Sequence, residues 1–149
     1  MPDILFYQLL AKPLEVVLPD LLEKSLLKGW RAVVQGADEA RLNTLDTALW
    51  TYRDDSFLPH GTKGDGHAEE QPVYLTTGPE NPNGAAIRFL IDQAMVDNHA
   101  DYQRIVYLFN GHDPEALTHA RTRWKVEKAA GYDVAYWAEN SSGRWEKKA

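Results

Sequence analysis

A short segment near the end of the chain has the composition and spacing of a binding site for an acidic ligand. Its four residues are Arg121, Trp124, Lys125 and Lys128. They lie at positions i, i+3, i+4 and i+7, so a helix places them on one side. Arginine can bind a carboxylate through two parallel hydrogen bonds, and an indole offers an apolar wall. The stripe suits an acidic peptide with an apolar end, and also single-stranded nucleic acid, through phosphate contacts and base stacking.

The charge distribution favours the peptide over the nucleic acid. The chain of 149 residues has a net charge of −6 and a pI of about 5.3. Residues 1–110 hold nine Lys and Arg against sixteen Asp and Glu, whereas residues 111–149 hold seven against six. Binding to phosphate backbones usually needs a basic face, and one helical stripe is small for that purpose. We therefore expect no direct nucleic-acid ligand, and keep a single-stranded nucleic-acid-binding protein as the alternative.

Three apolar residues form a second candidate surface. Phe57 and Leu58 lie in a segment, residues 50–71, that is rich in glycine and polar residues and is expected to be a long loop. Such loops are often functional, and aromatic residues are frequent anchors of protein interfaces. Both residues could equally fold back into the core. Trp50 ends an expected helix, where core packing is the simpler interpretation, so it is an uncertain interface residue.

The sequence offers little support for catalysis or a cofactor. There is no cysteine, which excludes thiolate nucleophiles and cysteine-based metal sites. Gly61, Gly64 and Gly66 have the reverse spacing of a dinucleotide-binding fingerprint and follow no expected strand. His60 and His67 lack the spacing of paired metal ligands on a helix. We expect neither an active site nor a cofactor, and no membrane contact, since no apolar run approaches the roughly 18 residues of a membrane span.

Strands and helices alternate along the chain in the pattern of an α/β sheet. The expected helices begin at Pro13, Asp38 and Asp113 and end near Gly29, Trp50 and Gly131, with Pro19 kinking the first helix or delaying its start. Apolar and β-branched runs predict strands at residues 3–9, 31–35, 72–76, 86–91, 101–110, 134–137 and 143–145. This order predicts one domain, residues 1–149, with a mostly parallel sheet and helices on both faces.

Several of these segments together resemble one known family, the chi subunit of bacterial DNA polymerase III. No single piece is decisive, but their order and spacing extend over most of the chain. The matching pieces are Phe6-Tyr7-x-Leu9, Leu45-Asp46-x-x-Leu49-Trp50, Ser56-Phe57-Leu58-Pro59-His60, Gln71-Pro72-Val73 and Ala120-Arg121-x-Arg123-Trp124-Lys125.

The resemblance implies a non-catalytic adaptor of the polymerase holoenzyme in the bacterial cytoplasm. Chi-like subunits have a Rossmann-like fold without a nucleotide-binding loop. They bind the psi subunit and the acidic, Phe-terminated tail of single-stranded-DNA-binding protein. By similarity, Phe57 belongs to the psi interface, with Leu58 beside it. Arg121 and Trp124 match positions that hold the tail, and Lys125 and Lys128 extend that site.

Two positions depart from the pattern of some relatives. Leu117 stands where they have a lysine, and Asn110 aligns near an apolar contact position, so the tail site is expected to be less basic here. Residues 138–149 form a C-terminal extension to which the resemblance assigns no role.

Overall fold

The computed structural model describes residues 2–50, 60–62, 66–96 and 99–149. They form one eight-stranded sheet with the order β3-β4-β2-β5-β6-β1-β7-β8. The strands are β1 (Asp3–Leu9), β2 (Ala32–Gln35), β3 (His60–Thr62), β4 (Val73–Thr76), β5 (Ile87–Leu90), β6 (Arg104–Asn110), β7 (Asp133–Glu139) and β8 (Trp145–Lys147). All neighbouring strands are parallel except β7 and β8, which are antiparallel. The predicted mostly parallel α/β sheet is confirmed.

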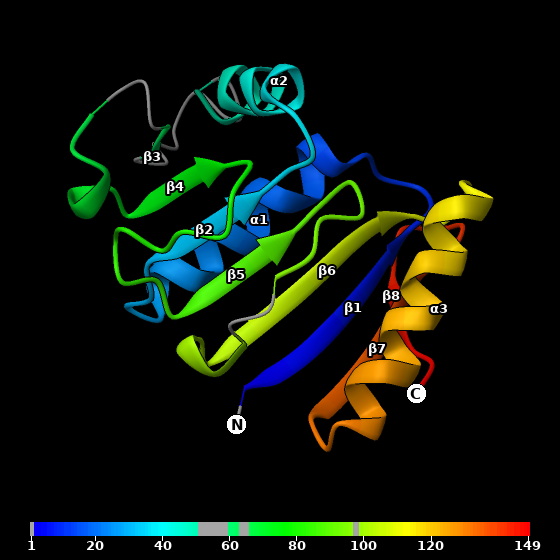
Figure 1. Ribbon diagram of the computed structural model, residues 1–149. Helices are drawn as coiled ribbons and strands as arrows, with labels where there is room; N and C mark the ends of the chain where they lie inside the picture. Colours follow the sequence, from blue (N-terminus) through cyan, green and yellow to red (C-terminus); the bar gives the residue numbers. More distant parts are fainter. Residues whose placement is uncertain (1, 51–59, 63–65, 97–98) are drawn as a thin grey trace.

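Three α-helices cover the two faces of this sheet. They are α1 (Leu14–Leu27), α2 (Glu39–Trp50) and α3 (Pro114–Ala129). Figure 1 shows α3 on one face, over β6, β1 and β7, and α1 on the other, behind β2 and β5. Side chains alternate between the faces along each strand. In β1, Ile4 and Phe6 therefore join the cluster under α3, and Leu9 joins the cluster under α1 and α2.

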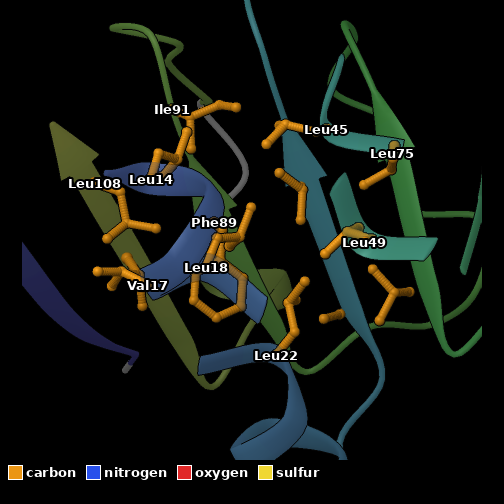
Figure 2. Close-up of a cluster of buried hydrophobic side chains, with 14 of the residues drawn as sticks. Leu14, Val17, Leu18, Leu22, Leu45, Leu49, Leu75, Phe89, Ile91 and Leu108 are labelled. Atoms are coloured by element: carbon orange, nitrogen blue, oxygen red, sulfur yellow. The ribbon is translucent and has the colours of Figure 1, made fainter. Parts of the chain in front are cut away.

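The larger core lies between the sheet and the helices α1 and α2. Leu14, Val17, Leu18 and Leu22 recur at helical spacing on α1 and are buried. Figure 2 shows these side chains directed at Phe89 of β5 and its neighbours. These four residues form the apolar stripe that α1 buries.

Helix α1 starts earlier than one prediction allowed. Pro13 is its N-cap, and the helix runs through Pro19 without a delayed start. The prediction that Pro19 delays the start of the helix was therefore wrong. Pro19 is buried with the apolar stripe, so packing holds the helix where one backbone hydrogen bond is lost. The helix ends before Gly29, whose φ of +82° is a conformation that favours glycine.

The prediction of one long loop over residues 50–71 was wrong in part. The described part of this segment contains the short strand β3 and a 3-10 turn, η2 (Ala68–Glu70). Strand β3 has three residues and pairs with β4 alone. Its strand conformation therefore depends on a neighbour distant in the sequence. A second short 3-10 turn, η3 (His99–Asp101), precedes β6.

A buried arginine fixes the loop between β4 and β5. It lies on the face of the sheet that also carries α3. Arg88 of β5 is fully buried. Its guanidinium donates to the carbonyls of Gly78 and Glu80, at 2.5 and 3.0 Å, and to Gln35 and Tyr102. Burial lowers the pKa of Arg88, and its contacts with Tyr102 and Glu80 act in the opposite direction. Two of these hydrogen bonds hold the loop, and the others connect Arg88 to β2 and to Tyr102.

Candidate peptide-binding site

Helix α3 carries the predicted binding stripe, and its sequence sets both of its ends. Asp113 is the N-cap, with its side chain accepting a hydrogen bond from the backbone N–H of Glu115 at 3.0 Å. Pro114 occupies the first turn, where its missing donor does no harm. Ala116 and Ala120 are buried against the sheet. These small side chains allow the helix to lie close to β6 and β1, which leaves its opposite side exposed.

Trp124 lies where α3 meets the aromatic side chains of the sheet. Its ring centroid is 6.1 Å from those of Phe6 and Tyr136, both in edge-on orientation. Such contacts are favourable for aromatic rings. The indole is half-buried, so it belongs partly to the core and partly to the surface. One part of the indole packs in the core, and the other part is accessible to a ligand.

A cavity of about 310 Å³ opens beside this indole. It is lined by Gln8, Arg121, Trp124, Tyr136 and Ala149. The hydroxyl of Tyr136 donates to the side-chain oxygen of Gln8. Burial raises the pKa of Tyr136, and the nearby Arg121 opposes that rise. The phenol therefore stays neutral, and the cavity combines the guanidinium of Arg121 with an aromatic wall.

The four predicted residues contribute unequally to this site. Arg121 is exposed and makes no ion pair with any residue that the structure describes. Lys128 places its ammonium 5.2 Å from the centroid of the Trp124 ring, an attractive cation–π arrangement. Lys125 is exposed and is not among the lining residues of the cavity. Of the four, Arg121 and Trp124 therefore line the cavity, and Lys128 lies next to it at the Trp124 ring.

Arg123, the other arginine of this segment, has a structural role. It forms an ion pair with Glu127, one turn later on α3. Glu127 is only 2% exposed, and its Oε1 also lies 3.2 Å from His99 and 3.3 Å from the hydroxyl of Tyr107. Burial together with the charge of Glu127 raises the pKa of Tyr107 to about 12. This network fixes α3 on the sheet and directs Arg123 away from the cavity.

Sequence reasoning missed Gln8, Tyr136 and Ala149. Tyr136 pairs with Phe6 in the parallel β1–β7 ladder, so Gln8 and Tyr136 project from neighbouring strands on one face. Ala149 reaches the cavity through backbone hydrogen bonds with Tyr136, at 3.2 and 3.4 Å. The alternation of the strands indicated which face Tyr136 occupies, but the sequence held no signal that β7 lies beside β1.

Comparison with known proteins identifies the family to which this chain belongs. The family model described as "DNA polymerase III chi subunit, HolC" matches residues 1–135. This chain belongs to the chi subunit family of DNA polymerase III. The chain is 35% identical over 71 residues to the probable DNA polymerase III subunit chi of Rickettsia prowazekii, covering 48% of this chain and 43% of the relative. It is 28% identical over 117 residues to the subunit chi of Pseudomonas aeruginosa, covering 76% of this chain and 78% of the relative.

Family membership makes the chain an accessory subunit of a DNA polymerase complex. The matched region includes Arg121 and Trp124 but ends before Tyr136. Tyr136 and Ala149, which form part of the cavity wall, therefore lie beyond the residues that match the family model. That part completes β7 and forms β8, so residues 138–149 are integrated into the sheet.

The two departures from the pattern of chi relatives lie outside the cavity lining. Leu117 is half-buried and packs against the aromatic core under α3. Asn110 ends β6, and its side-chain oxygen accepts from the backbone N–H of His112 at 2.9 Å. Neither residue therefore shares the cavity wall with Arg121 and Trp124.

The second candidate surface is only partly described. Trp50 is the last residue of α2, on the opposite side of the sheet from α3. Phe57 and Leu58 lie outside the described residues, so their assignment stays a prediction.

The loop after β1, where nucleotide-binding folds hold phosphate, is filled by the chain itself. The backbone N–H groups of Leu10, Ala11 and Lys12 all donate to Oε1 of Glu139, at 2.9–3.0 Å. Glu139 is 2% exposed. Burial acts to raise the pKa of Glu139, but these donors and Lys12 outweigh it and lower that pKa. An internal carboxylate thus occupies the position that a phosphate takes in such folds.

Two further properties bear on ligands and location. Among the described residues there is no cluster of three side chains able to hold a metal ion. Nor does any described helix have the length and apolar character needed to cross a membrane.

Proposed function

We propose that this chi-family chain is a non-catalytic adaptor of the polymerase holoenzyme, and that its α3 cavity binds the acidic, Phe-terminated tail of single-stranded-DNA-binding protein. The observation that carries the proposal is the exposed Arg121 beside the half-buried Trp124 on one cavity wall. The guanidinium would hold the terminal carboxylate or a neighbouring acidic side chain, and the indole would pack against the terminal phenyl ring.

The test is a fluorescence-polarisation titration with a labelled acidic peptide that ends in Phe. The same peptide without its final Phe is the ligand control. Arg121→Ala should weaken binding by about 1.5–3 kcal/mol, or roughly 10- to 150-fold, as expected for a charge-assisted hydrogen bond. Arg144→Ala is the matched control, because Arg144 is exposed and does not line the cavity. Equal affinity of the Arg121→Ala and wild-type proteins would contradict the assignment.

The same titration separates the adaptor from the alternative, a direct single-stranded nucleic-acid-binding protein. A labelled oligothymidylate replaces the peptide, under the same buffer and salt conditions. An adaptor binds the Phe-terminated peptide and leaves the oligonucleotide free. Saturable binding of the oligonucleotide, lost in Arg121→Ala, would favour the alternative for this cavity.

For the second partner, the psi subunit, we propose an interface that contains Phe57 and Leu58, with Trp50 as a further candidate. Its support is family membership together with the resemblance of residues 56–60 to the chi pattern. Phe57→Ala should weaken co-purification with psi and leave the affinity for the tail peptide unchanged. Loss of tail binding in Phe57→Ala would contradict two separate surfaces.

A further inference from the structure

A groove on the face opposite α3 has no part in the proposed tail site. It has a volume of about 600 Å³ and lies beside α1. One side of α1 forms its wall, through residues that recur every three or four positions. These wall residues are Val16, Val17, Asp20, Leu21, Lys24, Ser25 and Lys28. The wall therefore extends along most of the 14-residue helix, or about 20 Å.

The floor of the groove is a part of the sheet that is only half covered. On β1, Ile4 and Phe6 face α3 and are 0% exposed, whereas Leu5 and Tyr7 face the groove and are half-buried. In the described part of the chain, α1 and α2 are the helices on this face, and their main contacts are with β2, β3, β4 and β6. Leu5 and Tyr7 of β1 are thus incompletely covered by the described helices on this face, which is unusual for a mostly parallel sheet.

Aromatic side chains and cations surround this floor. Tyr7, Trp30, Trp137 and Trp145 line the groove, and the rings of Tyr7 and Trp145 meet edge-on at 5.1 Å. Three of the five tryptophans of the chain therefore lie at this one surface. The lining cations are Lys12, Lys24, Lys28 and Arg104, against Asp20 as the lining carboxylate. Lys24 pairs with Asp20 at 3.0 Å, Arg104 with Asp3 at 3.4 Å and Lys12 with Glu139 at 3.8 Å. Among the described residues, Lys28 is the lining cation without an ion pair, and its ammonium lies 4.8 Å from the centroid of the Trp30 ring.

We propose that this groove binds an amphipathic α-helix of a partner protein, with an apolar stripe flanked by acidic residues. A helix fits better than an extended strand of nucleic acid because the wall follows the length of α1 and the floor is mostly apolar. Helices pack side by side at 8–10 Å between axes, so the incoming helix would complete the layer that α1 and α2 begin. One of its acidic flanks would meet Lys28 beside Trp30.

Two exposed residues of α1 provide a variant and its matched control. Val16 is 49% exposed and lines the groove, whereas Leu27 is 83% exposed and does not line it. The probe is a labelled amphipathic helical peptide of about 20 residues, with leucines along one stripe and glutamates on both flanks. Val16→Asp puts an unpaired charge at the interface and should weaken binding at least tenfold. Leu27→Asp should leave the affinity within about twofold of wild type.

Two further experiments test whether the partner must be acidic and whether it binds in the groove. A peptide with lysines in place of the glutamates should bind poorly to wild type and better to Lys28→Glu. Arg121→Ala should bind the glutamate peptide as wild type does, because Arg121 lies on the other face of the sheet. Failure of the tail-peptide titration would therefore leave this result intact, and the reverse also holds.

Three outcomes would overturn the proposal. The first is absence of saturable binding of the glutamate peptide to wild type. The second is an equal effect of Val16→Asp and Leu27→Asp, with both variants folded by circular dichroism. The third is saturable binding of oligothymidylate in place of the peptide, with quenching of tryptophan fluorescence, that Arg121→Ala retains. That outcome would assign the groove to single-stranded nucleic acid.

Discussion

Glu127 shows at the residue scale how one buried carboxylate can determine the position of a binding helix. It accepts hydrogen bonds from Arg123 and Tyr107 and lies 3.2 Å from His99, so contacts from three elements meet at one side chain. Burial alone would raise the pKa of Glu127, but the hydrogen bonds with His99 and Arg123 outweigh it and lower that pKa. The folded state therefore favours the ionised carboxylate.

Replacing this carboxylate should destabilise the protein in a pH-dependent way. Glu127→Gln should lower the free energy of unfolding at pH 7 by about 3 kcal/mol, at the lower end of the range for a broken buried ion pair, because Arg123 keeps some contact with water. Because the folded pKa lies below the ordinary value of 4.5, this contribution is complete above pH 4.5. It disappears as the pH falls through the folded pKa.

Urea unfolding of wild type and Glu127→Gln at pH 7 and pH 3 measures this effect. The matched control is Glu115→Gln, an exposed carboxylate in the first turn of the same helix. Its cost should stay below about 1 kcal/mol, the size of an interaction with the helix dipole. A pH-independent difference between wild type and Glu127→Gln would contradict the assigned ionisation.

At the scale of the elements, the loop between β1 and α1 is closed by a strand from the far end of the sequence. Glu139 ends β7 and caps the three N–H groups of residues 10–12. Lys12 in turn donates to the carbonyl of Gly143 at 3.0 Å. The β7–β8 turn and the start of α1 are therefore stabilised together.

Removing this carboxylate should expose an anion-binding loop. Glu139→Ala leaves the buried donors without an acceptor and should cost about 3 kcal/mol of stability. Inorganic phosphate should then raise the melting temperature of Glu139→Ala, since ligand binding to the folded state stabilises it. Thermal unfolding with increasing phosphate, at constant ionic strength, measures this response. Wild type and the exposed control Glu146→Ala should not respond specifically, and an equal response of all three proteins would refute the interpretation.

For the molecule as a whole, the distribution of charge matters more than its total. The net charge of −6 repels an acidic ligand, whereas the exposed Arg121 and the neighbouring Lys125 and Lys128 attract it locally. Attraction between exposed charges is screened by salt. The screening length falls from about 30 Å at 0.01 M to about 3 Å at 1 M.

Tail binding should therefore weaken with salt in a manner that depends on Arg121. Raising sodium chloride from about 0.01 M to about 1 M should reduce the affinity of wild type for the Phe-terminated peptide by about tenfold or more. Arg121→Ala should show a clearly smaller dependence, because the remaining contact with Trp124 is mostly apolar. Polarisation titrations across this salt series measure both slopes. Parallel slopes for the two proteins would show that Arg121 does not carry the electrostatic attraction.

Local sequence patterns determined most of the secondary structure. The run of residues 3–9 predicted β1 with its observed bounds, and Asp113, Pro114 and Gly131 marked the ends of α3 to within about two residues. The shared helical face of Arg121 and Trp124 also followed from their spacing alone. Each of these features depends on neighbours within one or two turns, so the sequence carries the information directly.

Tertiary structure alone decided what these elements form together. Strand β3 exists through pairing with β4, and the cavity wall of Gln8 and Tyr136 exists because β7 pairs with β1 across more than 120 residues. Glu139 fills the loop after β1 for the same reason. The groove beside α1 depends on which strands the helices leave uncovered. The sequence by itself determined the local elements and the α3 stripe, whereas long-range strand pairing, which no local pattern encodes, decided the surfaces they build.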